Sequence, residues 1–239
     1  MPTRLTFEPE NEAYPIWSPD DQTIVFSYQQ SNGGFDIYKK PSTGAGVSER
    51  LFASKALKFS MDWAADGKTI FLQSNDPYQR NNWDIIRLSP DTGAAVDVIA
   101  TKFNEAVPQI SPDSRWLAYI SDQSGTPNVY IEPFPQTGAK YQVSTGGGVQ
   151  PRWRRDGKEL FYRMVDERLA SVTIKTTGKG LEISTPTVLF TSHLAAASGV
   201  GGMQYDVSPD GQKFLMSVSK VEGIRPLTLV TNWTADVNR

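Results

Sequence analysis

The sequence predicts an all-β fold made of five repeats, each of them a four-stranded antiparallel sheet. Three observations predict this fold. One turn motif occurs five times, a strand-like apolar spacing follows each copy, and a Thr-Gly pair recurs four times in a second register. Four strands in a repeat of about 45 residues match the size of one propeller blade. A five-bladed β-propeller is therefore the expected architecture.

The turn motif has the form Trp-Ser-Pro-Asp-Gly, with substitutions between copies. Its aspartates are 46, 47, 43 and 54 residues apart, which places one copy in each repeat. An Asp-Gly pair supplies the positive φ that a short turn needs, so each copy predicts the turn between the first and second strands. We expect the aspartate to hydrogen-bond the turn backbone rather than bind a metal. The copies are Trp17–Asp21, Trp63–Gly67, Ile110–Ser114, Trp153–Gly157 and Val207–Gly211.

The remaining strands of each repeat follow the turn in a fixed order. Second strands begin four residues after each aspartate and are predicted at residues 24–26, 70–72, 117–119, 160–162 and 214–216. Third strands precede the Thr-Gly pairs and are predicted at residues 36–38, 84–86, 128–131 and 169–172. Fourth strands are predicted at residues 50–52, 96–99, 141–143 and 188–190.

The last repeat has no Thr-Gly pair and no sequence for a fourth strand after residues 226–230. Near the other end of the chain, Arg4-Leu5-Thr6-Phe7 matches the fourth-strand pattern of Arg50-Leu51-Phe52. We therefore expect a strand at residues 3–8 to complete the last blade and close the ring without a free sheet edge. The prediction is one domain over residues 1–239, with blades at about 9–53, 54–101, 102–145, 146–192 and 193–239 plus 3–8.

Composition excludes several classes of function. The 24 basic and 26 acidic residues give a net charge of −2 without a basic stripe, so nucleic acid is not an expected partner. The absence of cysteine and a single histidine, His193, exclude disulfides, thiolate zinc sites and multi-histidine metal clusters. The first residues lack the apolar core, roughly 7 to 15 residues long, of a secretory signal. No cofactor, metal or membrane insertion is predicted.

In a propeller of this kind, the motif turns and the third-to-fourth turns emerge on one face, and their stereotyped sequences predict a scaffold. The opposite face carries the second-to-third loops and the connections between blades, which vary in length and chemistry and so predict binding. Residues just before each innermost strand should set the mouth of the central channel. Two further candidates, Tyr78 and Trp83, come from the aromatic loop before the predicted strand at residues 84–86. The full set of candidate ligand-binding residues is Glu12, Tyr14, Lys58, Asp62, Tyr78, Trp83, Glu105, Gln150, Arg152 and Gln204.

Three tryptophans occupy the first position of the turn motif. Trp17, Trp63 and Trp153 share this position with Ile110 and Val207. Because this position is occupied by Ile or Val as well as by Trp, its side chain is predicted to pack in the core between blades rather than to form a stacking platform for a ligand.

The Trp-Ser-Pro-Asp-Gly template resembles the TolB-like propeller repeat over essentially the whole chain. The segment Gly147–Tyr162, followed by Tyr205–Gly211 and Asn232-Trp233, resembles the C-terminal propeller of bacterial Ser/Thr kinases and related sensor proteins. This resemblance implies a WD40-like interaction or sensory module in a periplasmic or other extracytoplasmic place. TolB itself has six blades beside an N-terminal domain, so its own partnership is not implied here.

The expected function is that of a non-catalytic binding, scaffold or sensory module, acting as a monomer on a protein or peptide. A small molecule or sugar at the channel mouth is the other possible ligand. One alternative is a carbohydrate-active hydrolase, whose paired carboxylates would come from Glu12, Asp62, Glu105 and Asp206. A second alternative is calcium held by Glu12, Glu105 and carbonyl oxygens of the channel. Serine hydrolase chemistry is excluded because the chain has no Gly-x-Ser-x-Gly motif.

Overall fold

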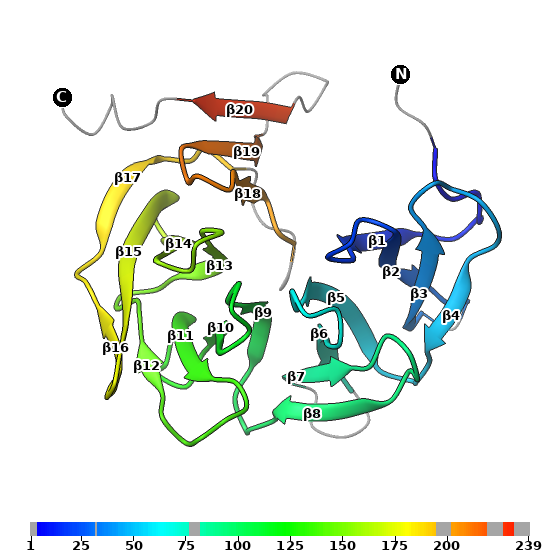
Figure 1. Ribbon diagram of the computed structural model, residues 1–239, viewed down its shortest axis with the longest axis horizontal. Coiled ribbons are helices and arrows are strands. Elements are labelled where there is room, and N and C mark those ends of the chain that lie inside the picture. The colour runs from blue at the N-terminus through cyan, green and yellow to red at the C-terminus, as the bar shows by residue number, and fades with distance from the viewer. Residues whose placement is uncertain (1–3, 32, 77–81, 195–201, 219–226, 232–239) are drawn as a thin grey trace. The chain divides into compact units, whose positions relative to one another are not determined.

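The computed structural model describes residues 4–31, 33–76, 82–194, 202–218 and 227–231 (Figure 1). The chain divides into two compact units, unit 1 at Met1–Ile110 and unit 2 at Ser111–Arg239. Each unit consists of antiparallel sheets whose strands follow one another in chain order. The described residues contain no helix, and therefore none that could cross a membrane. The all-β class is confirmed.

Unit 1 contains two complete four-stranded sheets and one further strand. The first sheet has the order β1 (Glu12–Trp17), β2 (Thr23–Gln29), β3 (Phe35–Pro41) and β4 (Glu49–Phe52). The second has the order β5 (Leu57–Trp63), β6 (Ile70–Asn75), β7 (Trp83–Leu88) and β8 (Ala95–Ile99). Strand β9 (Glu105–Ile110) is the first strand of the third repeat.

Unit 2 contains the other strands. They are β10 (Trp116–Ser121), β11 (Asn128–Pro133) and β12 (Tyr141–Gln142) in the third repeat. The fourth repeat has β13 (Val149–Trp153), β14 (Glu159–Arg163), β15 (Arg168–Thr177), β16 (Gly180–Ile183) and β17 (Thr187–Thr191). The fifth has β18 (Tyr205–Val207), β19 (Lys213–Ser217) and β20 (Leu227–Thr231). The predicted positions of the second, third and fourth strands agree with these bounds.

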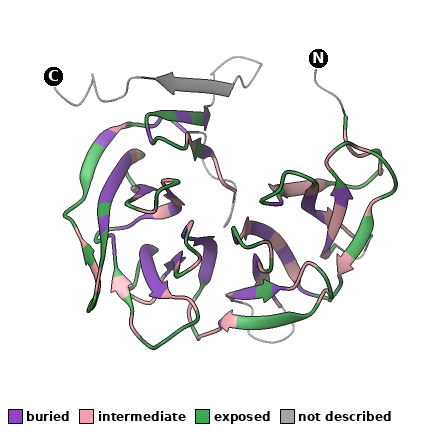
Figure 2. Cartoon of the chain, viewed as in Figure 1, coloured by how far each residue is buried: buried purple, intermediate pink, exposed green. Residues whose placement is uncertain are grey.

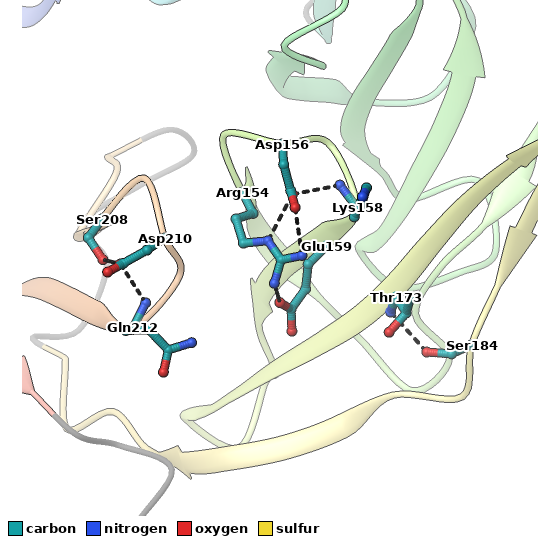
Figure 3. Close-up of polar contacts among 9 residues, drawn as sticks. All are labelled: Arg154, Asp156, Lys158, Glu159, Thr173, Ser184, Ser208, Asp210 and Gln212. Carbon is teal, nitrogen blue, oxygen red and sulfur yellow. Dashed lines mark hydrogen bonds and ion pairs between the residues drawn. The ribbon is translucent and has the colours of Figure 1, made fainter.

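The motif turns have the predicted structure. The residue after each motif aspartate has positive φ, between 58° and 74°, whether it is glycine, Asp21 or Ser114. In the fifth repeat, Ser208 Oγ donates to Asp210 Oδ1 at 2.5 Å, and the Gln212 amide donates to the same oxygen at 3.0 Å (Figure 3). The aspartates therefore hold turn backbone, as expected from the sequence.

The fourth repeat has one strand more than predicted: β17 stands at the predicted position of the fourth strand, and β16 is an additional short strand before it. Strand β17 pairs with the first half of β15, from Arg168 to Ser171, and β16 pairs with the second half, from Ile174 to Thr177. Pro186 lies between β16 and β17 and has no amide hydrogen for the ladder, which accounts for the break between them.

The predicted N-terminal strand is absent, since residues 4–8 have no strand structure. They lie against the first sheet instead. Thr6 Oγ1 donates to Glu12, and Ser48 Oγ donates to Glu8 Oε1 at 2.8 Å. Among the described strands, β20 pairs with β19 alone. Closure of the last blade by residues 3–8, the number of blades and the single-domain boundaries stay predictions.

Within each unit, buried apolar residues gather between successive sheets, mostly on the second and third strands of the repeats, which carry much of the purple in Figure 2. In unit 1 the core cluster joins Val25 and Ile37 of the first sheet to Ile70, Leu72 and Leu88 of the second. In unit 2 the corresponding cluster joins the fourth repeat to the fifth, with Phe161, Leu169, Leu189, Tyr205, Phe214 and Met216 among its members. Each unit is therefore stabilised by packing one sheet face on the next.

Candidate aromatic binding site

Four aromatic side chains meet near the first residues of strands β1, β3, β5 and β7. The Phe59 ring lies 4.4 Å from the Tyr14 ring and 5.5 Å from the Trp83 ring, measured between centroids. The Phe35 ring packs edge-on against Phe59 at 5.2 Å. All four side chains are partly exposed to solvent. We call Tyr14, Phe35, Phe59 and Trp83 the aromatic cluster.

Backbone strain fixes the position of Tyr14 in this cluster. Its φ is +54°, in the left-handed region that a tyrosine rarely adopts, and it lies in a β-bulge between Ala13 and Ile16. Ser60 Oγ on the neighbouring sheet donates to the Tyr14 carbonyl oxygen at 2.5 Å. Burial raises the pKa of the Tyr14 hydroxyl, so this group stays neutral at physiological pH.

Side-chain amides hold Trp83 on the other side of the cluster. The Trp83 amide donates to Asn104 Oδ1 at 3.1 Å. The buried neighbour Asn82 donates through Nδ2 to the carbonyl oxygens of Thr101 at 2.9 Å and Phe103 at 2.7 Å. These bonds attach the beginning of β7 to the connection before β9, which gives the indole a fixed support.

Lys58 precedes Phe59 and points into the protein. Its side chain is fully buried, and Nζ donates to the Ser54 carbonyl oxygen at 3.0 Å, to Ser54 Oγ at 2.9 Å and to the Ala56 carbonyl oxygen at 2.8 Å. An ion pair with Asp36 at 3.4 Å completes its surroundings. Burial lowers the pKa of Lys58, an effect that the Asp36 charge opposes. This geometry gives Lys58 a structural role, and its contact with a ligand stays a prediction.

The candidate acids of unit 1 have internal partners. Glu105 is fully buried and accepts from Thr101 Oγ1 at 2.7 Å. Asp62 accepts from the Ile110 amide at 2.8 Å and from the Trp63 amide at 2.9 Å. Glu12 accepts from Thr6, while its Oε1 is buried without a hydrogen-bond partner among the described residues. Burial raises the pKa of Glu12, and the Thr6 hydrogen bond opposes that effect.

In unit 2 the candidate residues form a polar group of their own. Gln150, with φ of +54°, donates through Nε2 to the Gly202 carbonyl oxygen at 2.6 Å and to Gln204 Oε1 at 3.2 Å. Gln204 also accepts from Arg163 Nη1 at 3.3 Å. Arg152 forms an ion pair with Asp206 at 3.7 Å. The structure thus brings Gln150 and Gln204 together, as the sequence suggested.

Two members of the aromatic cluster, Phe35 and Phe59, were not among the residues predicted from the sequence. Lys58 was predicted from the segment that contains Phe59, but successive side chains of a strand point to opposite faces, so Lys58 and Phe59 do not share one. The expected core role of the motif tryptophans is wrong for Trp17, which is 55% exposed, and right for Trp153, which is 9% exposed. Tyr78 lies outside the described residues. Among those residues, no group of three or more acidic or histidine side chains could hold a metal ion.

Comparisons with solved structures show which fold these sheets form. TolB from Acinetobacter baumannii matches with a TM-score of 0.71 over 95% of this chain, at 17% identity. A protein assigned as TolB from Agrobacterium tumefaciens matches with a TM-score of 0.58 over 72% of the chain, at 20% identity. The chain folds as a TolB-like β-propeller. An oligogalacturonate lyase, solved in complex with manganese, also matches this propeller, with a TM-score of 0.61 over 98% of the chain at 14% identity.

The propeller spans only part of these proteins, namely 53% of the Acinetobacter TolB, 64% of the Agrobacterium protein and 65% of the lyase. A scan against protein-family models and a search of curated proteins find no match to the sequence. Since one propeller fold is shared by proteins as different as TolB and a lyase, the fold leaves the function to be argued from the site.

Proposed function

We propose that this propeller is a non-catalytic binding module that holds an apolar peptide segment of a partner protein on the aromatic cluster. The observation that carries this proposal is that the partly exposed Phe59 ring contacts three other partly exposed rings, each from a different strand, with their centroids 4.4 to 5.5 Å from its own. Exposed apolar patches mark interaction surfaces, and tyrosine and tryptophan are enriched at their energetic centres.

The cluster is also held in place before a partner arrives. The bulge at Tyr14 and the amide bonds around Trp83 fix two of its rings on strands rather than on loops. A preorganised surface loses little side-chain entropy on binding, so more of the contact energy is available for affinity.

A peptide fits the cluster better than a sugar does. A sugar requires several polar groups that converge on its hydroxyls. The amides next to the rings are engaged with the backbone instead, as shown by Asn82 Nδ2 with Thr101 and Phe103 and by Asn104 Oδ1 with Trp83. The hydrolase alternative is less favoured, because Glu105 is buried and hydrogen-bonded to Thr101.

The experiment is to select peptides from a displayed random library against the purified chain and to measure their affinity by fluorescence anisotropy. Trp83→Ala should weaken the selected peptides by about tenfold or more, the size of a hot-spot residue. Trp17→Ala removes an exposed indole outside the cluster and should leave the affinity unchanged. Circular dichroism would verify that both variants are folded.

Equal losses in the two variants would contradict the proposed site. Cleavage of any member of an oligosaccharide panel, abolished by Glu12→Gln or Glu105→Gln, would contradict the non-catalytic function and support the hydrolase.

A further inference from the structure

Each unit contains a groove between the motif turns of two successive repeats. In unit 2 the groove lies between the third and fourth repeats and has a volume of about 530 Å³. In unit 1 the equivalent groove lies between the first and second repeats and has a volume of about 510 Å³. Both volumes are in the range of ligand-binding clefts, about 300 to 1,000 Å³. We call them the unit 2 groove and the unit 1 groove.

The two grooves have opposite charge although they form at equivalent places. The unit 2 groove is lined by four basic side chains and two carboxylates, and its basic residues are Arg115, Arg155, Lys158 and Lys175. The unit 1 groove is lined by one basic side chain, Lys39, and three carboxylates. Since the repeats share their turn structure, the difference in charge comes from the side chains that vary between them.

Two cations of the unit 2 groove are not held in ion pairs, because the acids of the groove bind other cations. Asp113 is paired with Arg115 at 2.7 Å, and Lys175 is paired with Glu182 at 3.4 Å. Asp156 receives Arg154 through two bonds of 2.8 and 2.9 Å (Figure 3). In the part of the chain that the structure describes, the side chains of Arg155 and Lys158 form no ion pair. Both residues are exposed.

Apolar side chains form the rest of this groove. Pro112, Trp116 and the buried Ile174 line it between the charged residues. The Trp116 ring packs edge-on against Tyr141 at 6.0 Å, and the Ile174 amide donates to the Lys158 carbonyl oxygen at 2.8 Å. Trp116 lies in β10 and Ile174 in β15, so regular strands hold these two apolar side chains in the same groove as the cations.

We propose that the unit 2 groove binds an acidic peptide segment of a partner protein, with carboxylates at Arg155 and Lys158 and an apolar side chain between Trp116 and Ile174. Charge complementarity selects the acidic segment, and the apolar wall favours a peptide over a nucleic acid. Phosphate contacts on a duplex need an extended row of cations, whereas this chain has a net charge of −2. The site is separate from the aromatic cluster and does not depend on it.

The test uses the full chain and a fluorescein-labelled peptide of about ten residues that alternates Glu with Leu, long enough to cross the groove. Anisotropy should show binding that weakens as salt is added, because exposed charges are screened. The double variant Arg155→Ala/Lys158→Ala should bind about tenfold more weakly. Lys68→Ala is the matched control, since Asp66-Gly67-Lys68 repeats Asp156-Gly157-Lys158, and it should bind within about twofold of the parent.

A second variant tests whether one added cation is enough to create binding in the unit 1 groove. Ala65 occupies in the second repeat the place of Arg155 in the fourth, so Ala65→Arg adds a cation to the unit 1 groove without altering unit 2. This variant should not restore binding when combined with Arg155→Ala/Lys158→Ala, because three carboxylates remain around it.

Three results would overturn the proposal. The first is an equal loss of affinity in Lys68→Ala, which would reduce the effect to net charge. The second is equally tight binding of a Ser-Leu peptide of the same length. The third is tighter binding of a single-stranded oligonucleotide than of the Glu-Leu peptide, which would assign the groove to nucleic acid.

Discussion

Repeated backbone strain is the most informative feature at the scale of single residues. Tyr14, Val107 and Gln150 have φ between +53° and +54°, and each of them precedes a proline in the first strand of its repeat. Such a conformation costs about 1 to 3 kcal/mol for a residue with a side chain. The Asn-Glu-Ala-x-Pro segments, in which the sequence suggested a mouth, are therefore sites where the inner strand changes course and redirects its side chains.

A pair of glycines in unit 2 tests how much the turn conformation matters. Gly157 has φ of +71°, and a Cβ there would meet only Pro112 Cδ at 3.7 Å, so its replacement is costly because of the backbone alone. Gly157→Ala should lower the free energy of unfolding by about 1 kcal/mol. Gly178→Ala, where no positive φ and no close atom occurs, should be neutral or stabilising. Urea denaturation of both variants measures the difference, and equal values would contradict the argument.

Glu12 should make stability depend on pH. Burial raises its pKa in the folded protein above the ordinary value of 4.5, so the folded state binds the proton more tightly than the unfolded state. The stability from this protonation is complete below the unfolded pKa and is lost as pH rises through the folded pKa. Glu12→Gln, which resembles the protonated acid, should therefore melt higher than the parent at neutral pH. This advantage should shrink towards about pH 4.

Melting temperatures across this pH range test the prediction, with Glu10→Gln as the control for loss of an exposed charge. A difference between Glu12→Gln and the parent that stays constant with pH would exclude the titration of Glu12 as its cause.

At the scale of elements, the repeat determined most of what the sequence could predict. Motif turns and strand positions are local properties, which is why they agree with the structure from β2 to β19. The additional strand β16 is specific to the fourth repeat and ends before Pro186, so the pattern shared by the repeats could not predict it. The aromatic cluster was only half predicted, because its rings come from two sheets and the choice between Lys58 and Phe59 depends on which face each sheet buries.

At the scale of the whole molecule, two different roles can be assigned to residues 1–8. The sequence pattern predicts that they close the last sheet, whereas residues 4–8 contact the first sheet through Thr6 and Glu8. In the described strands β20 has one partner, β19, so its other edge offers unpaired backbone groups unless another segment covers it. These two roles predict different consequences when the segment is removed.

Deletion of residues 1–8 should cause aggregation and a lower melting temperature if the segment covers the edge of β20, because exposed edge strands pair with other chains. Ser48→Ala removes only the hydroxyl that donates to Glu8, and it should leave solubility unchanged. Size-exclusion chromatography with light scattering would measure aggregation, and a thermal melt would measure stability. A truncated chain that is as soluble and heat-resistant as the parent would contradict closure and leave the local contacts as the only role of the segment.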